Sequence, residues 1–224
     1  EEIAAARAEL GIAPGTVAIG AVTRLMPAKG NRYLIDAAPK VLAEHPSARI
    51  FIIGEGELQP ELEAQARALG LGDRLVFTGF RRDVGAALSA LDLLVFPSLA
   101  EGTPLTMFEA LAMGKPIVAT DADGLIDVLT DRQDALVVPK ANAGALAGAI
   151  TEVLRAPALA ASLAAAARQS GAKYDISAFV RKMERLYDLL HETARVPHRA
   201  GILKADLGFL ANRLREDASA GQAR

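Results

Sequence analysis

Short runs of apolar and β-branched residues recur along the chain, separated by longer stretches with helical spacing. Runs of this kind predict β-strands. The predicted strands are residues 17–22, 49–53, 75–78, 93–96, 116–120 and 135–138. Because strands and helices alternate in short units, we predict a Rossmann-like, doubly wound α/β fold, with a parallel sheet of about six strands covered by helices on both faces.

Two of the helices between these strands can be read from their apolar spacing. The first contains Tyr33, Leu34, Ala37, Ala38, Val41 and Leu42, and the second contains Leu58, Leu62, Ala66 and Leu69. Pro39 lies inside the first pattern, so we expect it to kink that helix or shift its boundary. Gly70 follows the second pattern and is well placed to end it.

The last third of the chain reads as helical. Residues 143–154, 158–170 and 176–190 have the spacing of three successive helices, which we expect to pack with the sheet in one domain, residues 1–190. Residues 191–224 form a predicted extension that is partly disordered. It contains one amphipathic helix, marked by the stripe Leu203, Leu207, Leu210 and Leu214.

Composition narrows the classes of partner. The 224 residues are 51% hydrophobic, and 25 Lys and Arg against 27 Asp and Glu leave a net charge of -2, so nothing favours nucleic acid or an anionic membrane. The chain has no cysteine and three histidines, which argues against thiol chemistry and histidine-rich metal sites. Without a membrane span or a signal peptide, we expect a cytoplasmic protein; peripheral membrane association of the full-length protein stays open. The chain lacks an initiator methionine and begins with helical residues, so we expect a fragment.

The first chemical candidates are two cations in the loop after the first predicted strand. Arg24 and Lys29 lie five residues apart there, at the edge of a parallel sheet where ligands collect. An arginine fork and a lysine ammonium together suit a pyrophosphate. The alternative is a solvated basic loop, because exposed Arg and Lys are common.

A glycine pair follows the second predicted strand. Gly54 and Gly56 flank Glu55, but Gln59 stands where a dinucleotide fingerprint needs its third glycine. A tight strand-to-helix turn explains the pair better than a dinucleotide fingerprint does, and such a turn also lets backbone approach a phosphate.

A glutamate pair follows the fourth predicted strand. Glu101 precedes a predicted helix, for which Thr103 is the expected N-cap and Pro104 the first residue, and whose free amides could hold an anion. Glu109 lies within that largely apolar helix and would need a hydrogen-bond partner, such as a sugar hydroxyl. The pair could also be a glycosidase acid and base, or two surface carboxylates. Aspartates 121, 123 and 127 read as turn caps, so we assign no metal.

Taken together, these segments resemble the C-terminal, donor-binding domain of group 1 (family 4) retaining glycosyltransferases, which have the two-domain GT-B fold. The resemblance covers residues 17 to about 190. It rests on the order and spacing of Arg24-Leu25-Met26-Pro27-Ala28-Lys29-Gly30, Gly54-Glu55-Gly56-Glu57-Leu58, Phe77-Thr78-Gly79-Phe80, Phe96-Pro97-Ser98, the Glu101 to Glu109 motif, and Gly114-Lys115-Pro116-Ile117-Val118-Ala119-Thr120-Asp121.

The resemblance implies roles for these residues. Glu101, Arg24 and Lys29 would be catalytic: the two cations would bind the diphosphate of a UDP- or GDP-linked donor, and Glu101 would hold hydroxyls of the transferred hexose. The other donor-binding residues would be Gly54 and Gly56 in their turn, the amides of Gly102, Thr103, Leu105 and Thr106 around Pro104, Glu109 at the ribose, and Phe80 and Arg81 at the base. No cofactor and no divalent ion would be needed, since cations and a helix N-terminus stabilise the departing diphosphate.

The sequence departs from the family pattern at several positions. Thr23, Arg132, Ala135 and Ala141 stand where glycines are usual, and Asp123 and Ile126 replace a glycine and a proline. The N-terminal domain that supplies the acceptor site in this family is missing, so we expect weak donor binding and no transfer by this chain alone. A non-catalytic binding or scaffold module, and a related epimerase or phosphorylase, remain alternatives.

Overall fold

The computed structural model describes residues 2–194 and divides the chain into two units, Glu1–Lys173 and a second unit that begins at Tyr174. The division falls before the third predicted C-terminal helix, whereas the sequence placed a domain boundary after residue 190. The predicted leucine stripe at Leu203 to Leu214 lies outside the described residues.

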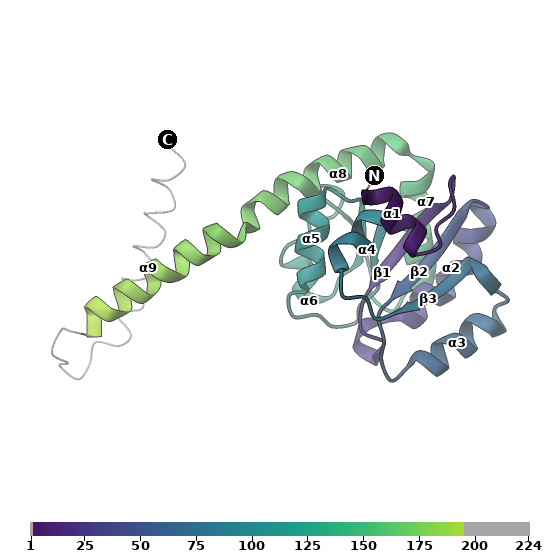
Figure 1. Ribbon diagram of the computed structural model, residues 1–224, viewed down its shortest axis with the longest axis horizontal. Helices are drawn as coiled ribbons and strands as arrows, with labels where there is room; N and C mark the ends of the chain where they lie inside the picture. The colour runs from purple at the N-terminus through teal and green to yellow at the C-terminus, as the bar shows by residue number, and fades with distance from the viewer. Residues whose placement is uncertain (1, 195–224) are drawn as a thin grey trace. The chain divides into compact units, whose positions relative to one another are not determined.

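The first unit is built on one six-stranded sheet (Figure 1). Its strands are β1 (Val17–Val22), β2 (Ala48–Ile53), β3 (Leu75–Gly79), β4 (Leu93–Phe96), β5 (Ile117–Thr120) and β6 (Leu136–Val138). All neighbouring strands pair in parallel, in the order β3-β2-β1-β4-β5-β6. The six predicted strands and the Rossmann-like α/β fold are therefore confirmed, and the strand order reverses between β1 and β4.

Helices cover both faces of this sheet (Figure 1). In the first unit they are α1 (Glu2–Glu9), α2 (Asn31–Glu44), α3 (Gln59–Ala68), α4 (Val84–Ala90), α5 (Leu105–Met113), α6 (Asp123–Ile126), α7 (Ala143–Arg155) and α8 (Pro157–Gly171), with the 3₁₀ turns Pro27–Lys29, Gly72–Arg74 and Ala172–Tyr174 between or after them. Alternate residues of each strand point to opposite faces. In β2, for example, Ile50 and Ile52 join the core beneath α2, α3 and α7, while Phe51 and Ile53 join the core beneath α1, α4 and α5. Burial on both faces explains why the strands read as continuous apolar runs.

Two expectations about helix boundaries can be compared with the structure. Helix α2 continues past Pro39 to Glu44, so the proline does not end it. Pro39 is exposed, while Leu34, Ala38 and Val41 are fully buried against the sheet, and this packing offsets the lost backbone hydrogen bond. Gly70 has a left-handed φ of 65° just beyond the end of α3, as expected of a helix-terminating glycine.

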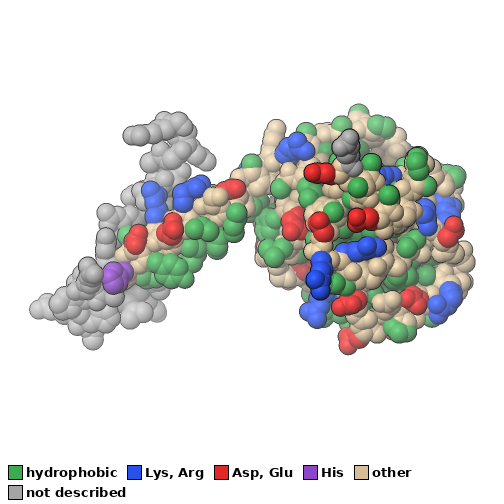
Figure 2. Space-filling model, in the orientation of Figure 1, with side chains coloured by type: hydrophobic (Ala, Val, Ile, Leu, Met, Phe, Trp, Pro, Cys, Tyr) green, Lys and Arg blue, Asp and Glu red, His purple; other side chains and the backbone are tan. Residues whose placement is uncertain are grey.

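The second unit contains helix α9 (Ile176–Ala194). Its apolar residues recur every three or four positions, and Ile176, Phe179, Val180, Tyr187 and Leu190 are exposed. Figure 2 shows hydrophobic side chains along one side of this helix and charged ones along the other. Among the described helices, no single one is long and apolar enough to cross a membrane. One bent pair of helices, Ala143–Arg155 with Pro157–His191, is long and apolar enough together, by length and composition only.

Candidate functional site

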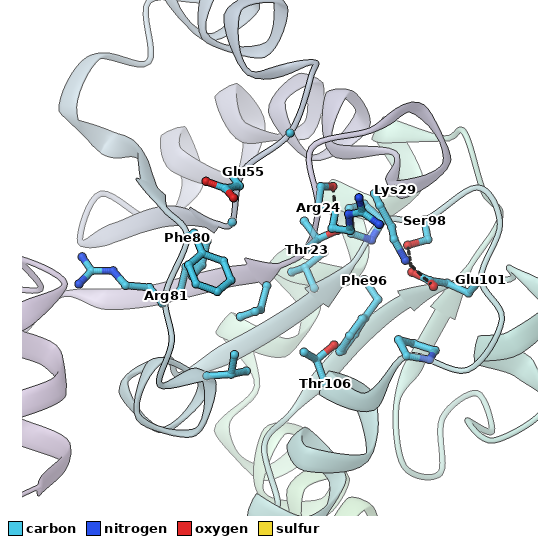
Figure 3. Close-up of a pocket in the computed structure, with 18 residues that line it drawn as sticks. Thr23, Arg24, Lys29, Glu55, Phe80, Arg81, Phe96, Ser98, Glu101 and Thr106 are labelled. Carbon is cyan, nitrogen blue, oxygen red and sulfur yellow. Dashed lines mark hydrogen bonds and ion pairs between the residues drawn. The ribbon is translucent and has the colours of Figure 1, made fainter.

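A cavity of about 520 Å³ opens at the carboxyl ends of β1, β2 and β4, where the strand order reverses (Figure 3). We call it the main cavity. The residues predicted from the sequence that line it are Arg24, Lys29, Gly54, Gly56, Phe80, Arg81, Glu101, Pro104 and Thr106. Gly102, Thr103, Leu105 and Glu109 do not line it. Open α/β sheets bind ligands at this position, so the cavity is the candidate site.

Two loops meet across the cavity floor and bring its charges together. The carbonyl of Ala28 accepts hydrogen bonds from the amides of Leu99 at 2.8 Å and Ala100 at 3.2 Å. Gly30 turns the first loop with a φ of 61°, and a Cβ there would overlap the carbonyl oxygen of Pro97. Only glycine allows this approach, which sets Lys29 beside Glu101.

Lys29 and Glu101 form a short ion pair. The Lys29 ammonium lies 2.6 Å from Oε2 of Glu101, and the Ser98 hydroxyl donates to Oε1 at 2.7 Å (Figure 3). The side chains are 21% exposed for Lys29 and 6% for Glu101. An ammonium has three donors and a carboxylate about four lone-pair positions, so both groups retain free positions toward a ligand.

Arg24 supplies a second cation on the same cavity wall. Its side chain is exposed, and its guanidinium has no hydrogen-bond or ion-pair partner within residues 2–194. All of its donors are therefore available to a bound anion.

Helix α5 presents its N-terminus beside the cavity. The predicted N-cap at Thr103 is wrong, since Pro104 occupies that position and no side chain caps the helix. The extended Pro104, with a ψ of 125°, uses its carbonyl to accept from the amide of Met107. The amides of Leu105 and Thr106 have no acceptor among the described residues, so they can receive an anionic ligand.

The environment of Glu109 differs from the one that the sequence predicts. It is the fifth residue of α5 and is exposed, whereas Met107, Ala110 and Leu111 are buried on the opposite side of the helix. The inference that it needs a protein or ligand partner is therefore wrong, because water can solvate it. Its role at a ribose stays a prediction.

The loop after β3 separates its two predicted base-binding residues. Phe80 lies on the cavity wall with 63% of its surface exposed. The side chain of Arg81 points away from Arg24 and Lys29 (Figure 3). Arg81 lines the main cavity and also a second cavity of about 160 Å³ with residues of α1 and α4, and its role at the base stays a prediction.

The turn after β2 needs glycine for steric reasons, and its role at a phosphate stays a prediction. Gly54 has a φ of 138°, and a Cβ there would overlap the carbonyl oxygen of Thr23. The turn therefore requires glycine, and it also brings Gly54, Glu55 and Gly56 to the cavity wall.

Ser98 and Thr120 were not predicted from the sequence. Both are buried, with 2% of each exposed. Thr120 donates from Oγ1 to the carbonyl of Ser98 at 2.5 Å, and Ser98 in turn holds Glu101. The available signal for Ser98 is a hydroxyl two residues after a fully buried strand and three residues before a carboxylate.

Other polar residues of the predicted motifs have structural contacts. Burial lowers the pKa of Lys115, which donates to the carbonyls of Ser89 at 2.7 Å and Leu91 at 2.6 Å at the end of α4. Asp121 accepts from the amide of Lys140 at 2.7 Å, as a turn-capping residue does. The described part of the chain holds no cluster of three or more His, Asp or Glu side chains that could bind a metal.

Comparison with known proteins decides the family. A sequence model of the glycosyl transferases group 1 matches residues 16–156. The chain belongs to this family. The solved C-terminal domain of LpcC, a group 1 glycosyl transferase of Francisella tularensis, superposes with a TM-score of 0.68 at 27% identity, covering 73% of this chain and 88% of that domain. The expected fold of a GT-B C-terminal domain is confirmed.

Longer relatives extend beyond this chain. HepE of Anabaena, solved in complex with UDP and glucose, has a TM-score of 0.76 at 27% identity, over 84% of this chain and 52% of that one. The α-D-kanosaminyltransferase of Streptomyces kanamyceticus is 31% identical over 169 residues, 74% of this chain and 44% of that protein. The chain thus spans about half the length of these two relatives.

Two of the departures from the family pattern have a visible backbone consequence. Arg132 and Ala141, which stand where the sequence pattern expects glycine, both adopt a left-handed φ of 58°. These are the described non-glycine residues with positive φ. The glycine-favouring backbone is therefore retained at both positions although the glycine is not.

Proposed function

We propose that this group 1 glycosyltransferase chain is the donor-binding half of a retaining enzyme that transfers a hexose-type sugar from a UDP- or GDP-linked donor. The observation that carries the proposal is the convergence of Arg24, Lys29 and Glu101 on one cavity, next to unpaired amides of α5. The complex of HepE with UDP and glucose, a relative of the same fold, supports this donor class.

Each group has a role that its chemistry suits. Arg24 and Lys29 bind the diphosphate, assisted by the amides of Leu105 and Thr106. Glu101 accepts hydrogen bonds from hydroxyls of the transferred sugar through its free lone pairs, and Phe80 offers a flat apolar surface to the base.

The proposed reaction uses electrostatic stabilisation and no covalent nucleophile. As the bond from the sugar to the diphosphate breaks, the sugar gains oxocarbenium character and negative charge grows on the departing phosphate. Arg24, Lys29 and the N-terminus of α5 stabilise that negative charge, so no divalent ion is required. The acceptor oxygen bonds to the anomeric carbon on the face from which the diphosphate leaves, and a departing phosphate oxygen takes the acceptor's proton, so the configuration is retained.

The acceptor site is proposed to lie in the half of the relatives that this chain does not cover. This piece alone should then bind donor weakly and transfer nothing. The cytoplasmic location expected from the sequence stays a prediction.

The proposal is tested by thermal stabilisation of the 224-residue chain, since a ligand that binds only the folded form raises its melting temperature. UDP, GDP and ADP are compared, and at least one should raise Tm. Arg24→Ala and Lys29→Ala should each remove most of that rise, whereas Arg67→Ala, which alters an exposed cation on α3, should leave it intact. An undiminished rise in both site variants would exclude the diphosphate assignment.

A further inference from the structure

Glu101 lines the cavity, and neighbouring side chains of the protein hold its carboxylate. Its carboxylate has two described contacts: Lys29 at Oε2 and the Ser98 hydroxyl at Oε1. With 6% of the side chain exposed, Glu101 has little access to water, so its orientation depends on these two donors.

The two donors differ in how firmly they can fix the carboxylate. Lys29 is a flexible side chain with a compact point charge, and in the proposed function it also contacts the diphosphate. Ser98 is 2% exposed, sits directly after β4 and Pro97, and reaches Glu101 with a short side chain. A serine side chain has fewer rotamers than a lysine side chain, so the Ser98 hydroxyl restrains Oε1 of Glu101 more firmly than the Lys29 ammonium restrains Oε2.

Ser98 is itself held by the neighbouring strand. Thr120, the last residue of β5, donates to the Ser98 carbonyl at 2.5 Å and is also buried. The contacts therefore run from the buried Thr120 at the end of β5 through Ser98 to Glu101, and Ser98 and Glu101 both line the cavity.

We propose that Ser98, supported by Thr120, is a positioning residue that orients the Glu101 carboxylate toward the hydroxyls of the donor's sugar. This inference rests on the proposed function. It adds that binding of the sugar depends on the Ser98 hydroxyl, which donates to Glu101. Binding of the nucleoside diphosphate does not depend on that hydroxyl.

The test compares binding of a sugar nucleotide with binding of its bare nucleoside diphosphate. Calorimetric titrations of the 224-residue chain use UDP with UDP-glucose and GDP with GDP-mannose. Ser98→Ala should weaken binding of the sugar nucleotide roughly tenfold, the worth of one hydrogen bond to a charged group, and change binding of the bare diphosphate by less than about twofold. Ser98→Thr keeps a hydroxyl and should retain most of the preference.

Three further variants guard against a folding defect. Thr120→Ser should behave as the wild type, and Thr120→Val should reduce the sugar preference in the same direction as Ser98→Ala. Ser89→Ala removes a hydroxyl that donates within its own helix α4, and it should change neither titration.

The outcomes separate the two claims. If the wild type binds none of the four ligands, the proposed function fails and this inference with it. If the wild type binds and Ser98→Ala weakens both members of a pair equally, or neither, Ser98 does not position Glu101 and the inference is overturned while the donor site stands.

Discussion

The ion pair between Lys29 and Glu101 makes a prediction about stability that requires no ligand. The perturbation is a double-mutant cycle of Lys29→Met, Glu101→Gln and the combination. Removing one partner leaves the other charged or polar group poorly solvated, because only 21% of Lys29 and 6% of Glu101 is exposed. Removing both leaves no uncompensated charge, so the double variant should lose less stability than the sum of the single variants.

The magnitude follows from the burial of the pair. Breaking a fully buried pair costs about 3–5 kcal/mol, whereas an exposed pair contributes about 0.2–1 kcal/mol. The pair of Lys29 and Glu101, at 2.6 Å, is closer to a buried pair than to an exposed one, although water at the partly exposed Lys29 screens its charge to some extent. We therefore expect a coupling energy of about 1.5–3 kcal/mol, with each single variant about 2 kcal/mol less stable than the wild type.

Urea unfolding followed by far-ultraviolet circular dichroism provides the assay, since the chain has no tryptophan for fluorescence. Arg67 and Glu63 on α3 give a matched control, as their 3.8 Å pair is 70% and 37% exposed and should couple by less than about 0.5 kcal/mol. A coupling for Lys29 and Glu101 no larger than this control would refute the buried ion pair.

Two further predictions concern residues outside the cavity. Ala141→Gly should stabilise the chain by about 0.5–1 kcal/mol because Ala141 has a left-handed backbone, which glycine adopts without strain. As the control, Ala161→Gly within α8 should destabilise the chain by about 1 kcal/mol. Urea unfolding of both variants measures the two opposite changes, and a loss of stability with Ala141→Gly would show that Ala141 is not strained. For Lys115, burial lowers the folded pKa below the unfolded value of 10.5, so the unfolded state binds more protons between those two pKa values and stability rises with pH there. The free energy of unfolding of the wild type minus that of Lys115→Met should therefore rise as the pH approaches 10.5 from below, and a value that stays flat or falls there would show that the lysine is not desolvated.

The sheet could be predicted because its signal is local. Strands buried on both faces must be continuous apolar runs, and the connecting helices must carry one apolar stripe, so each element is marked within its own residues. The position of the site follows from topology, since the loops after parallel strands all reach one edge of the sheet. Arg24, Lys29 and Glu101 reach that edge for this reason.

The orientation of individual side chains was not predictable in the same way. Glu109 appeared to lack a partner because its neighbours along the chain are apolar, but helical periodicity sends Met107 and Ala110 inward and Glu109 outward. Arg81 follows Phe80 directly, yet the two side chains point in different directions, as neighbouring positions in an extended loop usually do. The N-cap at Pro104 depends on the backbone angles of the loop, which residue types only bias.

The contacts that bring Lys29 and Glu101 together cannot be read from a sequence motif. Lys29 meets Glu101 because Gly30 lets its loop approach Pro97, and because Ala28 binds the amides that follow Ser98. These are backbone contacts between segments about 70 residues apart, so no local pattern of residue types encodes them. The loop after β4 carries Pro97, Ser98 and Glu101, so a displacement of this loop would move both the Glu101 carboxylate and the Ser98 hydroxyl that donates to it. A substitution at Gly30 should therefore displace Lys29 and Glu101 together, and under the proposed function it should weaken binding of both the diphosphate and the sugar.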